Sequence, residues 1–322
     1  LGTPPQVRQA LTAALERIGD YPEIEAASLR TALAAFHNLA EELLLPGSGS
    51  TELIYLLPRV FRPRRAVLVQ PCFNEYAPAL QQVDCQIDSV YLSAEDDFSF
   101  SVEHIFSRVR EDTDLVLLAN PGNPTGIGID PQLLLRLAER LVECRLLVDE
   151  AFVDFCPARS VLAHVEKQPN LLVLRSMTKF YAIPGLRVGY LAGSQQDVAR
   201  LEAAKEPWTL SNLAIAAGRA CLQDVAYQQQ TLALIPQLRT DLRTGLEKLG
   251  LRVFSSEANY LLCQLSQNQV TAEALASKLR SAGLLIRNCA DFMLLDQSFF
   301  RVAVLSATEN RKLLALLKSI LD

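Results

Sequence analysis

The sequence predicts an α/β protein, with a large domain built on a mostly parallel sheet and a smaller α+β domain after it. Two observations carry this prediction. Through the middle of the chain, apolar runs of strand length alternate with segments of helical period, as in a parallel sheet covered by helices on both faces. Beyond Leu213, long helical segments replace this alternation. We therefore expect an N-terminal arm over 1–22, a large domain over 23–212 and a small domain over 213–322.

The strands of the large domain are predicted from six apolar runs. These are Ala66–Gln70, Ile87–Tyr91, Leu115–Ala119, Arg145–Asp149, Leu171–Arg175 and Val188–Ala192. Segments of helical period lie between the first four runs, over Glu75–Val83, Val102–Arg110 and Pro131–Val142. Because ligands of such sheets bind at the carboxyl ends of the strands, we expect the functional site at that edge.

The two ends of the chain show different patterns. A short helix and an extended arm are expected over Leu1–Tyr21, and a long helix that breaks near Pro236 is expected over Ala214–Gly250. The remaining predictions for the small domain are strands Asn259–Gln264 and Phe299–Val304 and helices Ala272–Ala282 and Glu309–Leu321. No low-complexity linker separates the domains, so we expect them to pack together.

Composition excludes several classes of protein. With 31 basic and 36 acidic residues, the net charge of −5 provides no electrostatic footprint for nucleic acid or an anionic membrane surface. The apolar runs are too short to span a membrane, and the first residues lack the pattern of a secretory signal. Seven cysteines without a Cys-x-x-Cys pair indicate reduced thiols and a cytoplasmic protein. Three scattered histidines show no zinc-ligand spacing, so no metal is expected.

Two of four unusual segments contain Gly, Asn and hydroxyl side chains. Gly47–Glu52 precedes an apolar helical run, and glycines and hydroxyls at a helix N-terminus suit a phosphate group. An ordinary helix cap is the alternative, and neither common nucleotide-binding glycine motif is present. Asn120–Gly126 directly follows a predicted strand, and its two Asn-Pro steps hold side-chain amides at the strand end. A plain loop is the alternative for this segment.

The other two segments contribute charged groups. Asp149 ends a buried strand, where a carboxylate needs a cation or hydrogen-bond donors. An internal ion pair or a helix cap is the alternative. Lys179 lies between apolar segments, and is either a solvated loop residue or a lysine that forms a Schiff base. Ser176 and Arg187 nearby offer a hydroxyl and a guanidinium for a phosphate.

Taken together, these segments suggest one ligand with four chemical features. It would have a phosphate, an aldehyde, a ring nitrogen and a ring oxygen, a description that fits pyridoxal 5′-phosphate. The expected partners are Ser50, Thr51, Ser176 and Arg187 for the phosphate, Lys179 for the aldehyde, Asp149 for the nitrogen and Asn123 for the oxygen.

In their order and spacing, these motifs resemble the fold-type I pyridoxal-phosphate enzymes of the aspartate aminotransferase superfamily over almost the whole chain. The resemblance implies a seven-stranded, mostly parallel sheet and a Schiff base on Lys179. It implies that Asp149 keeps the pyridine nitrogen protonated and that Asn123 bonds the ring oxygen. It also implies an aromatic cover for the ring from Pro71–Tyr76, for which we favour Tyr76 over Phe73.

The same resemblance implies a homodimer and a small phosphorylated amino-acid substrate. Tyr21, in the arm, would reach the phosphate bound by the neighbouring subunit. Arg301 and Arg287, on the small domain, would bind the anionic groups of the substrate. Leu1–Pro4 resembles the tail of a longer segment that helps to cover the substrate, so we expect residues before it. Met293-Leu294 departs from the Pro-Gly expected at that position and leaves the shape of the substrate lid open.

Two branches of the superfamily are most similar, namely the threonine-phosphate decarboxylases of cobalamin biosynthesis and the histidinol-phosphate aminotransferases. Three features favour the decarboxylases: the lysine loop Thr178–Arg187, the segment Ile286–Ala290, and Phe152 where aminotransferases have a tyrosine. The implied reaction converts L-threonine O-3-phosphate to (R)-1-amino-2-propanol O-2-phosphate. Transamination of histidinol phosphate with 2-oxoglutarate is the alternative. A non-catalytic binding protein of the same fold is a third reading, against which the complete set of motif residues argues.

Overall fold

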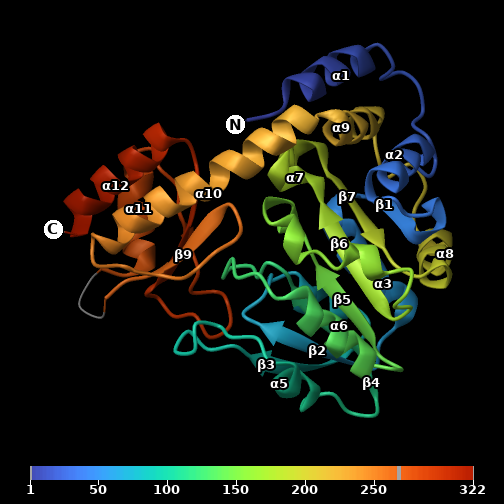
Figure 1. The fold of residues 1–322 in the computed structure, drawn as a ribbon, viewed down its shortest axis with the longest axis horizontal. Coiled ribbons are helices and arrows are strands. Elements are labelled where there is room, and N and C mark those ends of the chain that lie inside the picture. Colours follow the sequence, from blue (N-terminus) through green and yellow to red (C-terminus); the bar gives the residue numbers. More distant parts are fainter. Residues whose placement is uncertain (1, 267–269, 322) are drawn as a thin grey trace.

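The computed structural model describes residues 2–266 and 270–321, so Leu1 of the N-terminal motif lies outside the described residues. A seven-stranded sheet with helices on both faces forms the large domain, and a four-stranded sheet with α11 (Ala272–Ser281) and α12 (Ala307–Leu321) forms the small one (Figure 1). This arrangement confirms the predicted fold class.

The large sheet has the order β1-β7-β6-β5-β4-β2-β3. Its strands are β1 (Leu44–Ser48), β2 (Arg65–Gln70), β3 (Gln86–Tyr91), β4 (Thr113–Ala119), β5 (Arg145–Asp149), β6 (Leu171–Ser176) and β7 (Val188–Ala192). Neighbouring strands are parallel except at β7, which is antiparallel to β6 and to β1. All six predicted strands are present. Strand β1 was not predicted, because Pro46 and Gly47 weaken its strand pattern, although Pro is compatible with an edge strand.

Alternate residues of the strands face two separate hydrophobic cores, which explains why the strands read as continuous apolar runs. Val116 and Val148 face one core, whereas Leu117 and Leu147 face the other. Helices on the first face are α1 (Pro5–Leu15), α2 (Ala27–His37), α5 (Val102–Phe106), α6 (Pro131–Arg140) and α9 (Asn212–Gln223). Helices on the second are α3 (Gly49–Phe61), α4 (Tyr76–Gln81) and α8 (Gln195–Ala204), while α7 (Met177–Phe180) lies at the carboxyl end of β6.

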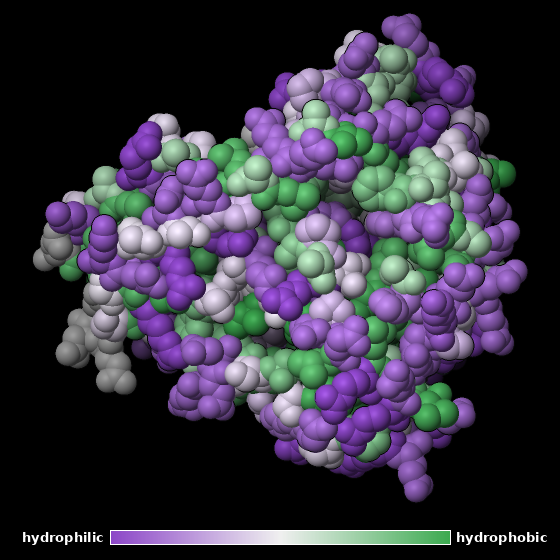
Figure 2. All heavy atoms as spheres, in the orientation of Figure 1, coloured by the Kyte–Doolittle hydropathy of each residue, from purple (hydrophilic) through white to green (hydrophobic). Residues whose placement is uncertain are grey.

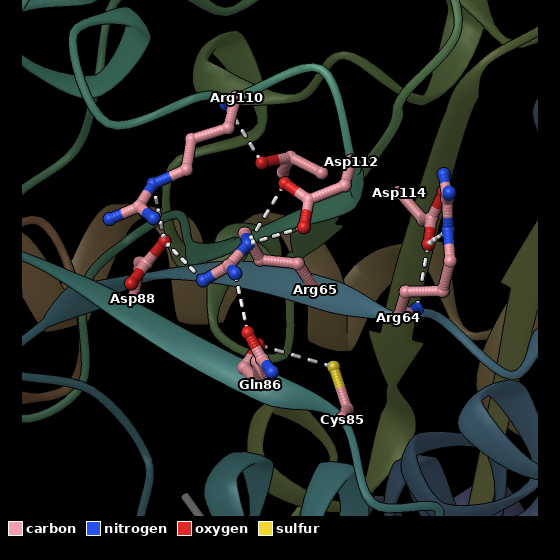
Figure 3. A network of polar contacts seen from close by, with 9 residues as sticks. Arg64, Arg65, Cys85, Gln86, Asp88, Arg110, Asp112 and Asp114 are labelled. Atoms are coloured by element: carbon pink, nitrogen blue, oxygen red, sulfur yellow. Dashed lines mark hydrogen bonds and ion pairs between the residues drawn. The ribbon is translucent and has the colours of Figure 1, made fainter.

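A network of charged side chains joins β2, β3 and β4 at their amino ends, opposite the edge where the site was expected (Figure 3). Arg65, at the start of β2, bonds Asp88 on β3 at 3.0 Å and Asp112 before β4 at 3.0 Å. Arg64 pairs with Asp114 on β4 at 2.9 Å. Because each arginine contacts a neighbouring strand or the segment before it, the network holds the register at this end of the sheet.

The chain crosses between the domains through α9 and α10 (Val225–Glu247) (Figure 1). The predicted break near Pro236 is wrong, because α10 continues through Pro236 and the helices separate at Asp224 instead. The Asp224 side chain caps α10 by accepting a hydrogen bond from the Tyr227 amide at 3.1 Å. Burial of Ile235 and Leu238 on either side of the proline offsets the one backbone hydrogen bond that it removes.

The small domain has the strand order β10-β11-β9-β8. Its strands are β8 (Arg252–Val253), β9 (Tyr260–Gln264), β10 (Arg287–Asn288) and β11 (Phe299–Ala303). The two longer strands and both helices were predicted, whereas the two-residue strands were not. Helix α9 begins at the predicted domain boundary, yet its buried residues belong to the core of the large domain. The boundary at 212/213 therefore stays a prediction.

Short 3-10 turns complete the described secondary structure, at Glu41–Leu43, Val153–Phe155, Pro157–Arg159, Leu162–His164 and Pro184–Leu186. Hydrophilic side chains cover most of the face shown in Figure 2, and hydrophobic groups form small separate areas. Across residues 2–266 and 270–321, no helix is long and apolar enough to cross a membrane.

Candidate active site

A cavity of about 200 Å³ lies at the carboxyl edge of the large sheet, where the sequence placed the site. It collects residues from the ends of β1, β2, β4, β5 and β6 and one arginine from β11 of the small domain. Its lining consists of Ser50, Thr51, Phe73, Tyr76, Ala119, Pro121, Asn123, Asp149, Ala151, Phe152, Lys179 and Arg301. Seven of the predicted site residues are therefore brought together in one cavity.

Asp149 ends β5 on the same sheet face as Leu147 and is 5% exposed. Its Oδ1 accepts a hydrogen bond from the Ala151 amide at 2.9 Å, and its Oδ2 accepts one from the Tyr76 hydroxyl at 2.6 Å. Burial raises the pKa of this carboxyl despite the two donors. Among the described residues, Asp149 has no ion pair, so the carboxylate is buried without a direct cation. A protonated ring nitrogen is a group that would supply one.

Tyr76 lines the cavity and bonds a carboxylate there, and its expected role as the cover of a bound ring stays a prediction. Its ring is 1% exposed, and its hydroxyl is committed to Asp149. Phe73 is the less buried ring of the pair and lies edge-on to Tyr76, with centroids 5.7 Å apart. Both rings line the cavity, so Phe73 is a second candidate for the aromatic residue that faces a bound ring, and the choice of Tyr76 stays a prediction. Burial, with Asp149 beside it, raises the pKa of Tyr76 well above its ordinary value, so the phenol stays a donor.

Lys179 extends from the short helix α7 toward the cavity. Its Nζ donates to Ser176 Oγ at 2.8 Å and lies 5.7 Å from the centroid of the Phe152 ring. Burial lowers the pKa of the Lys179 amine, whereas the nearby Asp149 carboxylate opposes this shift. A lysine with a lowered pKa is more often neutral near pH 7, as a nucleophilic amine must be.

The N-terminus of α3 forms the other end of the site. Gly49 and Ser50 open this thirteen-residue helix, and its free amide groups suit an anion. Gly49 has φ +73°, and a Cβ there would lie 2.7 Å from Nη2 of Arg187. A Cβ on Gly189 would lie 2.6 Å from the Ser50 amide nitrogen. These two glycines leave the space in which Arg187 and the helix N-terminus approach a common point.

Asn120 and Asn123, from the loop after β4, have separate roles. The Asn120 side chain holds the loop, because its Nδ2 donates to the Arg159 carbonyl and its Oδ1 accepts from the Ile129 amide, both at 2.8 Å. Asn123 lines the cavity, and its Oδ1 accepts a hydrogen bond from Arg301. With the oxygen occupied, the amide nitrogen of Asn123 is the group left to donate to a ligand.

Arg301 and Arg287 are directly opposite each other on the antiparallel strands β11 and β10. Opposite residues of such a pair point to the same face of the sheet, where two like charges repel. Arg301 lines the cavity. Arg287 does not line it, and instead pairs with Asp291, which also accepts a hydrogen bond from Asn74 of the large domain at 2.8 Å. Two arginines in this position favour an anionic ligand between the domains.

Tyr21 lies outside this cavity. It is 83% exposed on the arm, where its ring contacts Trp208 at a centroid distance of 5.6 Å. The structure describes a single chain, and Tyr21 does not contribute to the site of its own subunit. A role in a neighbouring site stays a prediction.

Tyr260 supports two residues of the cavity lining and was not predicted from the sequence. It begins β9, is 3% exposed, and its ring contacts both Arg301 and Phe152. A tyrosine in an apolar strand is read from sequence as a core residue, and only the strand pairing shows that it lies beside Arg301, behind the residues that line the cavity.

Comparison with known proteins shows what class of protein this fold and site define. The family model "Aminotransferase class I and II" matches residues 1–320, and the chain belongs to that family. Its members share the fold of the fold-type I pyridoxal-phosphate enzymes, and pyridoxal 5′-phosphate is their cofactor.

Three relatives are informative. Threonine-phosphate decarboxylase from Salmonella typhimurium is 37% identical over 326 residues, covering 100% of this chain and 88% of that protein. Histidinol-phosphate aminotransferase from Oleidesulfovibrio alaskensis is 32% identical over 329 residues, covering 100% and 85%. The crystal structure of histidinol-phosphate aminotransferase from Clostridium acetobutylicum superimposes with a TM-score of 0.92 at 28% identity, covering 99% and 96%.

Proposed function

We propose that the chain catalyses the decarboxylation of L-threonine O-3-phosphate to (R)-1-amino-2-propanol O-2-phosphate, a step of cobalamin biosynthesis. The observation that carries the proposal is the pair Arg301 and Arg287 on one face of the small sheet, next to the cavity that holds Lys179. A substrate with both a carboxylate and a phosphate would bring an anion to each guanidinium. The full-length similarity to a threonine-phosphate decarboxylase supports the same substrate.

The residues of the cavity, together with Ser176 and Arg187 beside it, fit pyridoxal 5′-phosphate. Ser50, Thr51, Ser176 and Arg187 would hold the phosphate, and Asp149 the ring nitrogen. Asn123 would donate to the ring oxygen, and Tyr76 or Phe73 would cover the ring. The cation of the ring nitrogen would offset the cost of burying the Asp149 carboxylate, which has only neutral donors in this structure. When bound, the cofactor accepts the electron pair of the bond that breaks at the substrate Cα carbon.

The side chains of this protein would then act on the substrate in three ways. Arg301 binds the carboxylate and, through Asn123, connects it to the ring-binding loop. Arg287 binds the distal phosphate. Lys179 holds the cofactor aldehyde in the resting enzyme, and its amine returns a proton to the Cα carbon once carbon dioxide has left. Burial, which lowers the pKa of the Lys179 amine, favours its neutral form.

A homodimer in the cytoplasm is part of the proposal. The exposed side chains of Tyr21, Ile24 and Trp208 form an apolar surface where the arm meets the large domain, and the Trp208 amide donates a hydrogen bond to the Ile24 carbonyl. A second copy would cover this surface and bring Tyr21 to the phosphate of the partner site. Sedimentation analysis of the wild-type chain and of Tyr21→Ala tests the assembly, since a monomeric wild-type protein would contradict it.

One assay separates the two enzymatic candidates. The reconstituted enzyme is incubated with threonine phosphate, and carbon dioxide and keto acids are measured together. Release of carbon dioxide without a keto acid supports the decarboxylase. Turnover only with histidinol phosphate and 2-oxoglutarate supports the aminotransferase, which the structural similarity to the Clostridium enzyme keeps as the second candidate.

A further inference from the structure

Tyr260 contacts two residues of the cavity lining, Arg301 and Phe152, and the loop that carries a third, Asn123. Its ring lies under the guanidinium of Arg301, with 4.6 Å between Cζ and the ring centroid. The ring of Phe152 packs edge-on against it, with centroids 4.9 Å apart and an interplanar angle of 86°. Its hydroxyl donates to the Gly122 carbonyl of the large domain at 2.6 Å. The buried side chain of Tyr260 thus contacts Gly122, which precedes Asn123 in the chain. It also contacts Phe152, whose ring lies near Lys179, and Arg301.

Strand pairing explains why Tyr260 meets Arg301. In the antiparallel pair β9 and β11, Arg301 is opposite Leu262, so Tyr260 is its diagonal neighbour on the same face. Long and aromatic side chains reach each other at this spacing. Gly126 of the loop after β4 lies close to the ring, because a Cβ there would lie 3.3 Å from Cε2 of Tyr260, although the Ser256 side chain would be nearer still. The position of the ring is therefore set by the strand on one side and by the loop after β4 on the other.

Arg301 has two contacts that bear on its orientation, the Tyr260 ring and the Asn123 side chain. Within the described part of the chain it forms no ion pair, and its hydrogen bond is to Asn123. A guanidinium stacked on an aromatic face keeps its N–H groups free around the edge of its plane. These are the groups that bind a carboxylate bidentately. Tyr260 thus determines the plane in which Arg301 can present its donors to a ligand.

We propose that Tyr260 is a positioning residue that aligns Arg301, and through it the substrate carboxylate, so that the bond from Cα to the carboxylate rather than the Cα–H bond stands perpendicular to the cofactor ring. The proposal rests on the proposed function, because it takes Arg301 as the carboxylate ligand. The bond perpendicular to the ring is the one that breaks, since it alone overlaps the π system. The orientation of one arginine would therefore set the ratio of decarboxylation to proton exchange at Cα.

The test compares substitutions at Tyr260 that keep or remove the aromatic face. Tyr260→Phe keeps the ring and loses the hydrogen bond to Gly122, whereas Tyr260→Leu removes the ring. Tyr260→Met provides a second non-aromatic variant of similar length in case the leucine variant does not fold. Phe254→Leu is the matched control, because Phe254 is also a buried ring of the small domain with an arginine, Arg252, 4.6 Å from its centroid.

Calorimetry on the holoenzyme gives the first readout. The ligands are 3-phosphooxybutanoate, which is the substrate without its amine, and isopropyl phosphate, which also lacks the carboxylate. We expect Tyr260→Leu or Tyr260→Met to weaken binding of the first by about tenfold and to leave the second unchanged. Tyr260→Phe and Phe254→Leu should both remain close to wild type. Equal weakening for both ligands, or no weakening, would overturn the proposal.

The second readout is the fate of threonine phosphate in D₂O. We compare the carbon dioxide released with the deuterium found at Cα of the unreacted threonine phosphate. This ratio should fall in the non-aromatic variants, whereas Phe254→Leu should keep the wild-type ratio. An unchanged ratio in both non-aromatic variants would contradict the role of Tyr260. If the wild-type enzyme itself releases no carbon dioxide, the proposed function fails, but the calorimetric comparison still reports on the alignment of Arg301.

Discussion

Tyr76 Oη lies 2.6 Å from Asp149 Oδ2, and this hydrogen bond is buried within the wall of the cavity. It joins the start of α4 to the end of β5, two elements far apart in the sequence. The phenol donates to the carboxylate that would face the ring nitrogen, and so helps to keep that carboxylate ionised.

Removing this donor should weaken the site. In Tyr76→Phe the ring packing is kept, but the buried carboxylate loses one of its two hydrogen bonds. Because hydrogen bonds to charged groups contribute about 1.5–3 kcal/mol, kcat/KM should fall by about ten- to a hundredfold. Affinity for pyridoxal 5′-phosphate, measured by fluorescence quenching, should fall with it. Phe73→Leu should instead change the cofactor spectrum through loss of the ring cover. Wild-type kinetics in Tyr76→Phe would show that the hydrogen bond is unimportant.

Asp149→Asn should stabilise the protein without cofactor. A carboxyl whose pKa is raised on folding contributes stability below its ordinary pKa, and loses that contribution as the pH rises through the raised value. Once the pH is above this raised pKa, the ionised, buried Asp149 destabilises the apoprotein, and the neutral amide removes this effect. We expect the melting temperature of the apo variant to exceed that of the wild type by about 1–3 °C at the alkaline end of a pH series, and the difference to shrink as the pH falls through the raised pKa and to vanish below about pH 4.

Added cofactor should reverse this order, because only the wild-type carboxylate gains a cation from it. Differential scanning fluorimetry with and without pyridoxal 5′-phosphate measures both effects. Equal stabilisation of the two proteins by the cofactor would show that Asp149 does not face the ring nitrogen.

Phe152→Tyr should change the titration of the bound cofactor. The Phe152 ring lines the cavity near Lys179 Nζ, so a hydroxyl added to it would enter the cavity. A phenol that donates to the cofactor ring oxygen stabilises the anion there, and the nitrogen that links the cofactor to Lys179 then holds its proton less tightly. We expect the pKa read from the visible absorbance of the holoenzyme to fall. Phe152→Leu adds no donor and should not lower this pKa. An unchanged titration in Phe152→Tyr would contradict the prediction.

Arg287→Met should raise KM for threonine phosphate more than it lowers kcat. Arg287 lies outside the cavity wall, opposite Arg301, where it would bind the distal phosphate rather than the reacting groups. Loss of a charged hydrogen bond predicts an increase in KM of about tenfold or more. Arg280→Met, an exposed arginine of α11 in the same domain, is the control. A loss of kcat alone would place Arg287 at the reacting centre instead.

The strands and the site edge could be predicted from the sequence because they depend on local patterns. A buried parallel strand is a continuous apolar run, and polar residues that follow such a run must lie at its carboxyl end. Asp149, Asn123 and Lys179 were found in this way. Strand β1 was not located, since Pro46 and Gly47 hide it, and its position depends on pairing with β7, more than a hundred residues later.

Pairings between distant segments were beyond the sequence. Nothing local to α4 distinguishes Tyr76 from Phe73, because the rotation of that helix against β5 decides which ring reaches Asp149. The continuation of α10 through Pro236 depends likewise on its packing against two cores.

By itself, the sequence determined the α/β class, the edge of the sheet that holds the site, and the chemical groups gathered there. Periodicity and strand-end residues are properties of short segments, so they can be read without knowing what packs against them. Only the tertiary structure decided that Tyr76 serves Asp149, that Arg287 is opposite Arg301, and that Tyr260 lies beneath the arginine of the cavity. Each of these relationships depends on strand register or helix rotation, which long-range packing sets and local sequence does not.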